Sequence, residues 1–245
     1  MTARTLLEIT GADRETFLQG LVTNDVRRIK DGPVYTALLT PQGKYIADFF
    51  MIDLGEAIGI DVDQALAPSL AQRLTMYKLR ADVAIEETAM HLHRGLGDIP
   101  EGGWADPRHP GLGWRAWRTE PAAADGTDWA ALYVRHLVPQ SRIELHSDTF
   151  ILEAGFERLH GVDFRKGCYV GQEVTARMKH KTELRKGLAR VTVDGAAEPG
   201  AEIVADGKVA GVLHTRAGTE AIAYLRFDRA QGDMRAGEAA VRRAD

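Results

Sequence analysis

The chain has 245 residues, of which 44% are hydrophobic and 27% are charged, and its formal net charge is −4. This composition excludes a globally disordered chain and one whose overall charge attracts nucleic acid or anionic membranes. The single cysteine, Cys168, excludes an intramolecular disulfide, a zinc site of several thiolates and an iron–sulfur cluster held by this chain alone.

The first half of the chain predicts a mixed α/β region. Its expected elements are a strand at 6–9, a helix that includes 17–22, a hairpin of strands at 35–39 and 44–54, a strand at 57–62, a helix at 65–77 and a strand at 83–87. Thr10 and Asp13 match a capping box before the first helix, and Pro68 fits the first turn of the second. Residues 40–43 (TPQG) have the composition of a turn.

The second half changes in texture along its length. Residues 95–127 are rich in Gly, Pro, Asp and Trp and are expected to hold strands joined by irregular loops. Residues 141–146 and 151–159 are expected to be helical in part. Beyond residue 188, short apolar runs alternate with Gly and Asp turns, which is typical of a small antiparallel barrel or sandwich. We place a boundary near residues 182–188.

The location of the protein is predicted from what the chain lacks. Residues 1–8 hold no apolar stretch of signal-peptide length, and no window approaches the roughly 20 apolar residues of a membrane span. A single cysteine also fits a reducing compartment. We therefore expect a cytoplasmic protein with no membrane partner.

Cys168 lies in the most informative segment of the chain. Gly167 and Gly171 flank it and give the backbone freedom, and a helix is expected to begin just after them. Arg165, Lys166 and a nearby helix N-terminus would favour the thiolate, which a nucleophile, redox sensor or metal ligand requires. The alternative is a buried and inert cysteine, because free cysteine is among the most buried residue types.

A basic patch surrounds this cysteine in the sequence. The segment from Arg165 to Arg190 contains eight basic and two acidic residues, whereas acidic residues outnumber basic ones in the rest of the chain. Such a patch can meet a polyglutamyl tail, a phosphate or RNA, and the alternative is a solvated basic face. Tyr169 is the only aromatic residue in that segment. Since single-stranded nucleic acid is held by stacking on several aromatic rings, nucleic acid is not an expected partner.

The run from Lys166 to Glu173, KGCYVGQE, resembles the KGC-Y-x-GQE signature of the YgfZ-type relatives of the glycine-cleavage T-protein. That lineage includes mitochondrial iron–sulfur assembly factors. Other segments similar to this family are 17–20 with 23–26, 37–44 with Asp48, and 152–156. The resemblance spans most of the chain and is weakest at 95–135.

The resemblance implies an α+β fold with a ring-like, T-protein-like arrangement of two mixed α/β subdomains in residues 1–183. A small antiparallel β-barrel would follow in residues 184–245. It implies a folate-binding accessory factor for the assembly or repair of iron–sulfur enzymes, notably those with [4Fe–4S] clusters. The implied ligand is tetrahydrofolate or a derivative, with no permanently bound metal. The implied partners are iron–sulfur scaffold or carrier proteins and client enzymes.

The resemblance also implies roles for single residues. Cys168 would be the functional thiol, and its action as nucleophile, redox thiol or transient cluster ligand stays open. The supporting residues of the motif would be Arg165, Lys166, Gly167, Tyr169, Gly171, Gln172, Glu173 and Arg177, the basic ones holding the thiol ionised or holding an anion. Asn24, Tyr45 and Asp48 are candidates for the pterin pocket, and the alternative for Asp48 is a strand aspartate that faces solvent.

A tetrahydrofolate-dependent aminomethyl or one-carbon transferase is the alternative function. Asp48 would then be the acid/base that such chemistry needs near the pteridine. The T-protein branch carries an Asp-Asp pair on the returning hairpin strand, where this chain has Ala47 and Asp48, and that branch lacks the cysteine motif. We therefore expect an accessory factor rather than a conventional enzyme.

Overall fold

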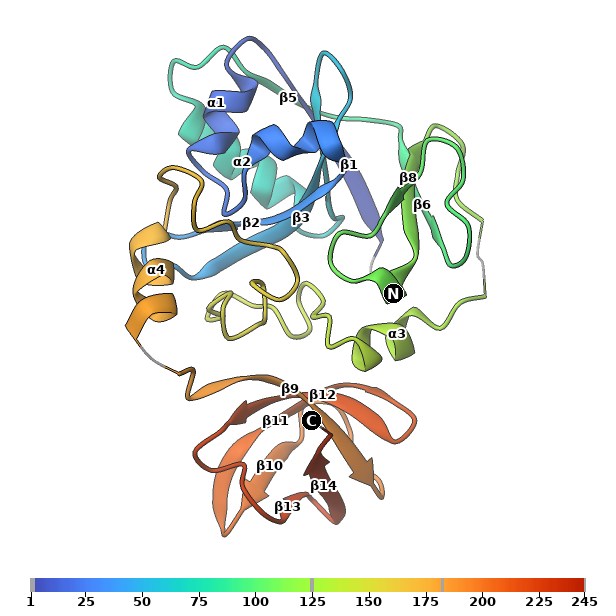
Figure 1. Ribbon diagram of the computed structural model, residues 1–245, viewed down its shortest axis with the longest axis vertical. Coiled ribbons are helices and arrows are strands. Elements are labelled where there is room, and N and C mark those ends of the chain that lie inside the picture. The colour runs from blue at the N-terminus through green and yellow to red at the C-terminus, as the bar shows by residue number, and fades with distance from the viewer. Residues whose placement is uncertain (1–2, 124–125, 182, 245) are drawn as a thin grey trace. The chain divides into compact units, whose positions relative to one another are not determined.

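A computed structural model describes residues 3–123, 126–181 and 183–244 of the chain (Figure 1). These residues form two compact units, which are described separately below. The first unit comprises Met1–Thr127 and Phe156–Ala176, and the second comprises Asp128–Gly155 and Arg177–Asp245. None of the helices within the described residues is both long enough and apolar enough to cross a membrane.

The first unit is built on two antiparallel sheets. Its elements are β1 (Arg4–Thr10), α1 (Arg14–Gln19), the 3-10 helix η1 (Val26–Asp31), β2 (Val34–Leu39), β3 (Tyr45–Asp53), β4 (Ile58–Asp63), α2 (Ala67–Lys78), β5 (Ala84–Glu87), β6 (His91–Gly95), β7 (Trp104–Ala105), the 3-10 helix η2 (Pro110–Leu112) and β8 (Trp114–Arg118). Five strands pair in the order β2-β3-β4-β1-β5, and three pair in the order β6-β8-β7. Helix α4 (Gln172–Lys181) begins in this unit, directly after Gly171, as predicted.

The five-stranded sheet has one apolar face and one face on which carboxylates lie among apolar side chains, because successive side chains of a strand point to opposite sides. On β3, Phe49 and Met51 join a core with Leu18 of α1 and Leu70 of α2. These two helices cover that face of the sheet (Figure 1). The alternate β3 positions, which include Asp48, lie on the opposite face. The strand pattern therefore places a carboxylate on the face that α1 and α2 leave uncovered.

The start of α1 differs from the prediction. The helix begins at Arg14, and its N-cap, Asp13, makes no capping hydrogen bond. The Asp13 carboxylate instead accepts a hydrogen bond from the backbone N–H of Asp82 at 2.8 Å. Gly11 has φ 102°, and a Cβ there would lie 2.1 Å from the Asp82 carbonyl oxygen. The predicted capping box is therefore wrong, because the chain turns tightly at Gly11 before the helix begins. The predicted place of Pro68 in the first turn of α2 is confirmed.

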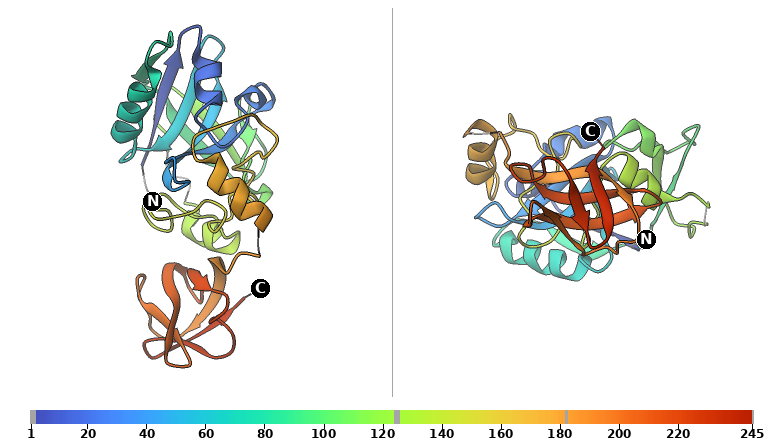
Figure 2. Two further views of the ribbon diagram at one scale, coloured as in Figure 1. Left: turned by 90° about the vertical axis from the view of Figure 1, so that its left-hand side faces the viewer. Right: turned by 90° about the horizontal axis from the view of Figure 1, so that it is seen from below.

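The second unit contains a closed antiparallel barrel (Figure 2). Its elements are α3 (Trp129–Arg135), β9 (Lys186–Asp194), β10 (Glu202–Ala205), β11 (Lys208–Ala217), β12 (Glu220–Arg226), β13 (Met234–Ala236) and β14 (Ala239–Arg243). The barrel order is β10-β11-β12-β9-β14-β13, around an interior of mostly small and branched apolar residues. The predicted α+β class with a C-terminal barrel is confirmed.

Residues 141–146 and 151–159 form turns rather than the partly helical segments that we predicted. The physical reason is visible at Glu144, whose carboxylate accepts hydrogen bonds from the backbone N–H of Gln140 at 2.9 Å and of Thr215 at 3.1 Å. The Glu153 carbonyl likewise accepts from the Leu188 N–H at 2.8 Å. The bonds to Thr215 of β11 and Leu188 of β9 tie the two segments to barrel strands, so that long-range contacts set their path. Because residues 128–155 group with the barrel, the division into 1–183 and 184–245 stays a prediction.

Candidate functional site

The thiol of Cys168 is exposed, in a loop that runs from residue 161 to residue 171 and ends at α4. We call this segment the cysteine loop. Its exposure excludes the alternative of a buried, inert cysteine. A small molecule or a protein partner can reach the sulfur without any opening of the first unit.

Lys166 anchors the loop to the body of the first unit. Its side chain is only 2% exposed, and its Nζ donates hydrogen bonds to the carbonyl oxygens of Gln19, at 2.7 Å, and of Val22. Burial lowers the pKa of Lys166 to about 8, against the opposing influence of Asp25 and Asp163. The prediction that Lys166 holds the thiolate or an anion at the surface is therefore corrected, because its charge faces inward.

The entry to the cysteine loop is held by Thr23 and Asn24. The Thr23 hydroxyl donates to the Gly161 carbonyl at 2.7 Å, and the Asp163 N–H donates to the Thr23 carbonyl at 3.0 Å. Asn24, which is 1% exposed, donates from Nδ2 to the carbonyls of His160 at 2.7 Å and Tyr35 at 2.8 Å. Residues 17–26, one of the segments similar to the family, thus pack directly on the loop. Asn24 stays a predicted pterin contact, but its amide N–H groups already have these partners.

The exit of the loop packs against the hairpin turn between β2 and β3. Gly171 has φ 84°, and a Cβ there would lie 2.6 Å from the Thr40 carbonyl oxygen and 3.2 Å from the Cα of Gly43. At Gly167 a Cβ would meet nothing within 4 Å, and its φ is not in the left-handed region. The backbone freedom that we predicted for both glycines is therefore required only at Gly171.

The remaining motif residues divide between buried and exposed positions. The Tyr169 ring is 7% exposed and lies 5.2 Å from Lys166 Nζ, and burial raises the pKa of Tyr169 to about 12. Gln172 Nε2 donates a long hydrogen bond of 3.4 Å to the Gly167 carbonyl. The other three, Arg165, Glu173 and Arg177, are exposed. Their predicted supporting roles stay predictions.

Gly171→Ala is expected to lower the free energy of unfolding by about 1–3 kcal/mol, because the new Cβ meets backbone atoms and the left-handed φ disfavours alanine. Gly167→Ala is the matched control in the same loop, and we expect it to stay within about 0.5 kcal/mol of wild type. Urea unfolding followed by tryptophan fluorescence measures both. Equal effects of the two substitutions would contradict this packing.

Two of the predicted pterin residues, Tyr45 and Asp48, are in contact with each other on the face of the sheet opposite α1 and α2. The Asp48 carboxylate accepts hydrogen bonds from the Tyr45 hydroxyl at 2.6 Å and from the Tyr35 hydroxyl at 3.0 Å. We call these three residues the tyrosine–aspartate cluster, and each is at most 3% exposed. The solvent-facing alternative for Asp48 is therefore wrong. Burial, and then the charge of Asp48, raises the pKa of Tyr35 well above its usual value, so this hydroxyl stays a donor.

Next to this cluster lies a buried ion network that sequence reasoning missed. Arg115 donates to Asp61 at 2.8 Å and to Asp106 at 3.2 Å. Arg4 bonds the same Asp61 at 2.5 Å, and Arg108 bonds the same Asp106 at 2.8 Å. Burial alone would raise the pKa of both carboxyl groups. Their arginine partners outweigh it, lowering the pKa of Asp61 and bringing that of Asp106 to about 2.

The Phe50 ring joins the network to the tyrosine–aspartate cluster. The guanidinium carbons of Arg115 and Arg108 lie 3.8 Å and 4.9 Å from its centroid, and that of Arg108 lies 5.5 Å from the Tyr35 ring. One signal could have found the network, namely Asp61 in a strand that otherwise reads as fully buried. A buried charge requires a partner of opposite sign, and the partners of Asp61 are Arg4 on β1 and Arg115 in the Trp-rich segment at 95–127.

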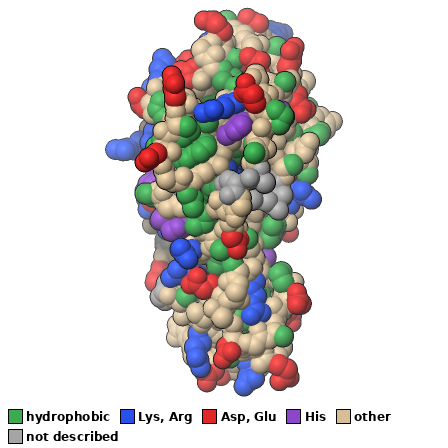
Figure 3. Space-filling view, turned by 90° about the vertical axis from the view of Figure 1, so that its right-hand side faces the viewer, with side chains coloured by type: hydrophobic (Ala, Val, Ile, Leu, Met, Phe, Trp, Pro, Cys, Tyr) green, Lys and Arg blue, Asp and Glu red, His purple; other side chains and the backbone are tan. Residues whose placement is uncertain are grey.

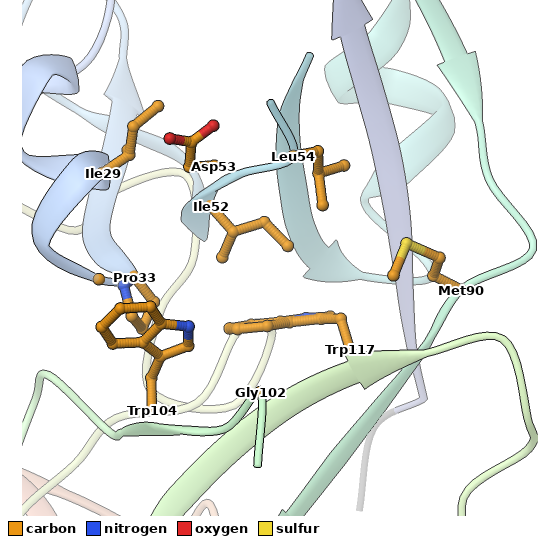
Figure 4. Close-up of a pocket in the computed structure, with 10 residues that line it drawn as sticks. Ile29, Pro33, Ile52, Asp53, Leu54, Met90, Gly102, Trp104 and Trp117 are labelled. Atoms are coloured by element: carbon orange, nitrogen blue, oxygen red, sulfur yellow. The ribbon is translucent and has the colours of Figure 1, made fainter. Parts of the chain in front are cut away.

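A small cavity of about 120 Å³ lies elsewhere in the first unit (Figure 4). The indole rings of Trp104 and Trp117 line it with Ile52, Leu54 and Met90 (Figure 4). Hydrophobic side chains also gather on the surface of the molecule, on the face shown in Figure 3. The cavity contains none of the predicted site residues.

The side chains of the described residues show whether a metal ion or a pterin would find suitable ligands. Within the described residues, no group of three or more His, Cys, Asp or Glu side chains is placed to hold a metal ion. The tyrosine–aspartate cluster has a carboxylate and hydroxyls of the kind that bind a pterin's amino and N–H groups. Both carboxylate oxygens, however, accept hydrogen bonds from tyrosines. A pterin would therefore have to replace one of these internal bonds.

Comparisons with known proteins show that most of the chain is similar to iron–sulfur assembly factors. Residues 185–244 match the family described as CAF17, C-terminal beta-barrel domain. The chain is 32% identical over 249 residues to the mitochondrial Iron-sulfur cluster assembly factor IBA57 homolog of Neurospora crassa, with 84% of this chain and 56% of that protein covered. It is 26% identical over 283 residues to the mitochondrial IBA57 of Mus musculus, with 96% and 78% covered. The chain thus spans little more than half of the fungal relative.

The fold has a counterpart among solved structures. The glycine cleavage system aminomethyltransferase T of Bartonella henselae matches with a TM-score of 0.74 at 13% identity, covering 97% of this chain and 81% of that one. At this identity the likeness shows the fold alone, and it confirms the T-protein-like architecture that we predicted.

The prediction of a cytoplasmic location is contradicted by these comparisons, because the IBA57 relatives are named as mitochondrial proteins. The prediction rested on a lone cysteine and on the low apolarity of the first residues. These features separate reducing from oxidising compartments. They do not separate one reducing compartment from another.

Proposed function

We propose that this chain is an accessory factor for iron–sulfur cluster assembly of the IBA57 kind, and that it acts through the exposed thiol of Cys168. The observation that carries the proposal is the placement of this thiol. It is exposed, while the loop on either side of it is pinned to the segments at 17–26 and 40–43. Similarity to iron–sulfur assembly factors over 84% of the chain supplies the substrate class.

In this proposal the cluster is the cargo and a partner protein shares its ligation. One thiolate cannot hold a cluster that ordinarily takes four, and Cys168 is the chain's only cysteine. The partner is therefore a scaffold, a carrier or a client enzyme that contributes the other ligands. Cys168 would bind iron as the thiolate and release its proton on binding. The exposed Arg165 beside it would favour contact with an acidic partner surface.

A tetrahydrofolate-type molecule is the proposed small ligand of the tyrosine–aspartate cluster. The donor set supports it in kind, and when bound such a molecule would supply a carrier of one-carbon units. The transferase alternative stays a prediction: the T-protein-like fold favours it, whereas a 3% exposed Asp48 with both oxygens engaged is poorly placed as an acid/base.

Cys168→Ser is expected to abolish function while leaving the fold intact. A deletion strain that carries the wild-type gene should regain the activity of its [4Fe–4S] enzymes, and one that carries Cys168→Ser should not. Because the side chain is exposed, the stability of the variant should stay within about 0.5 kcal/mol of wild type. Full restoration of those activities by Cys168→Ser would refute the proposal.

A further inference from the structure

We propose that Lys166 is the positioning residue of the cysteine loop, and that its ammonium group fixes the place of Cys168 by donating to the carbonyl groups of Gln19, the last residue of α1, and of Val22, three residues beyond it. The inference rests on the proposed function only in treating Cys168 as the working thiol. It assigns Lys166 a task inside the first unit, in place of a role at the surface.

Lys166 joins two parts of the chain that are distant in sequence, the cysteine loop and the segment at 19–22. Gln19 is the last residue of α1, and the final carbonyls of a helix have no partner within that helix. A lysine can supply the missing donors. Lys166 does so for Gln19 and also donates to the Val22 carbonyl in the segment after the helix, from a position two residues before Cys168 in the sequence.

The burial of this charge is costly to the fold, so its presence requires a reason. A methionine would fill the same space with no charge to desolvate. The charged groups that face Lys166 are Asp25, Asp163 and Arg27, and the Tyr169 ring packs beside it. The two carboxylates offset the cost of burial only in part. The hydrogen bonds that hold the loop account for the lysine.

The loop is fixed at its two ends by different means. On the exit side, the close approach of Gly171 to Thr40 sets the path of the backbone. On the entry side, Lys166 is the last buried side chain before the thiol, since residues 167 and 168 are exposed. Cys168 therefore lies on a short exposed bridge between the two anchors, and loss of Lys166 frees one end of that bridge.

The test compares Lys166→Met with Lys30→Met, the matched control for an exposed lysine of the same unit. Backbone hydrogen exchange is followed at residues 161–171 and in the barrel, together with the rate at which maleimide alkylates the single cysteine. We expect Lys166→Met to exchange at least about tenfold faster in the loop, with the barrel unchanged. We expect the alkylation rate to change at least about threefold. Lys30→Met should alter neither, and Lys166→Arg, which keeps the charge and the donors, should restore part of the protection.

The pH dependence of the free energy of unfolding adds a second test, because it reports the buried charge of Lys166 and not only the volume of its side chain. The pKa of Lys166 is about 8 in the folded chain against 10.5 for an ordinary lysine. Between these values the unfolded chain binds more protons than the folded one, so stability rises with pH. Below pH 8 the full cost of the buried charge is present. Wild type should therefore gain stability relative to Lys166→Met as the pH is raised from about 8 to 10.5.

Two outcomes would overturn the proposal. One is wild-type exchange and alkylation in Lys166→Met. The other is equal acceleration of exchange in the loop and the barrel, which would make Lys166 a general stabilising residue. Failure of the proposed function is a separate result. If Cys168→Ser restores the activity of iron–sulfur enzymes while Lys166→Met still speeds exchange in the loop alone, the proposed role of the thiol is wrong. The positioning role of Lys166 is then still supported.

Discussion

Replacing Arg115 by methionine is expected to lower the free energy of unfolding by about 3–5 kcal/mol, the range for removing one partner of a buried ion pair. Arg115 is 2% exposed and bridges Asp61 of the main sheet to Asp106 of the Trp-rich segment. Methionine fills much of the volume but donates no hydrogen bond. Each carboxylate would then keep a single arginine partner in a buried site. Urea unfolding at pH 7 measures the loss.

Arg118→Met is the matched control for this prediction. Arg118 lies on the same strand, β8, but it is exposed, and its guanidinium donates only a 3.2 Å bond to the Glu101 carbonyl. We expect its removal to cost less than about 0.5 kcal/mol. If Arg115→Met were equally mild, the network would contribute to specificity or ligand binding without stabilising the fold.

Elements in both units follow from local sequence where strands alternate and turns carry Pro and Gly. The hairpin around residues 40–43, the helix that contains Pro68 and the strands of the barrel are of this kind. Where long-range contacts decide, local patterns are insufficient. Gly11 turns against Asp82, and Glu144 bonds Thr215 instead of continuing a helix. Partners so distant in sequence leave no periodic signal.

The candidate site shows the same division between local and distant information. The motif located Cys168, and the hairpin resemblance placed Tyr45 and Asp48, which are in contact. The direction of the Lys166 side chain could not be read from the motif, because its partners lie at the end of α1. A basic residue two positions from a cysteine looks like an activating charge until the fold shows which way it points.

The packing also explains why scattered segments resemble one family. Residues 17–26 form hydrogen bonds with Lys166 and with Gly161 at the entry to the cysteine loop. The turn at 40–43 packs closely against Gly171 at the exit of the cysteine loop. Phe156 stacks on the Tyr35 ring with centroids 5.0 Å apart. The segments thus form a single assembly that presents one exposed thiol, and a change in any of them alters the support of Cys168.

Asp48→Leu is expected to lower the free energy of unfolding by about 2–5 kcal/mol, because it leaves two buried tyrosine hydroxyls without their acceptor. It also removes a negative charge that acts on the buried Arg4. Asp48→Asn keeps one acceptor oxygen and should cost less. Asp53→Asn, at an exposed position of the same strand, is the matched control and should resemble wild type.

The same variants separate a structural aspartate from a pterin contact. Titration of folded Asp48→Asn with tetrahydrofolate, followed by tryptophan fluorescence, should show weaker binding than wild type and Asp53→Asn if the tyrosine–aspartate cluster holds the pterin. Unchanged binding would leave Asp48 as a purely structural residue and move the proposed ligand elsewhere. Stability of Asp48→Leu equal to wild type would contradict the structural role itself. Because the carboxylate already accepts hydrogen bonds from Tyr35 and Tyr45, we expect both effects together: the hydrogen bonds that stabilise the tyrosine–aspartate cluster are those that a bound pterin would have to exchange.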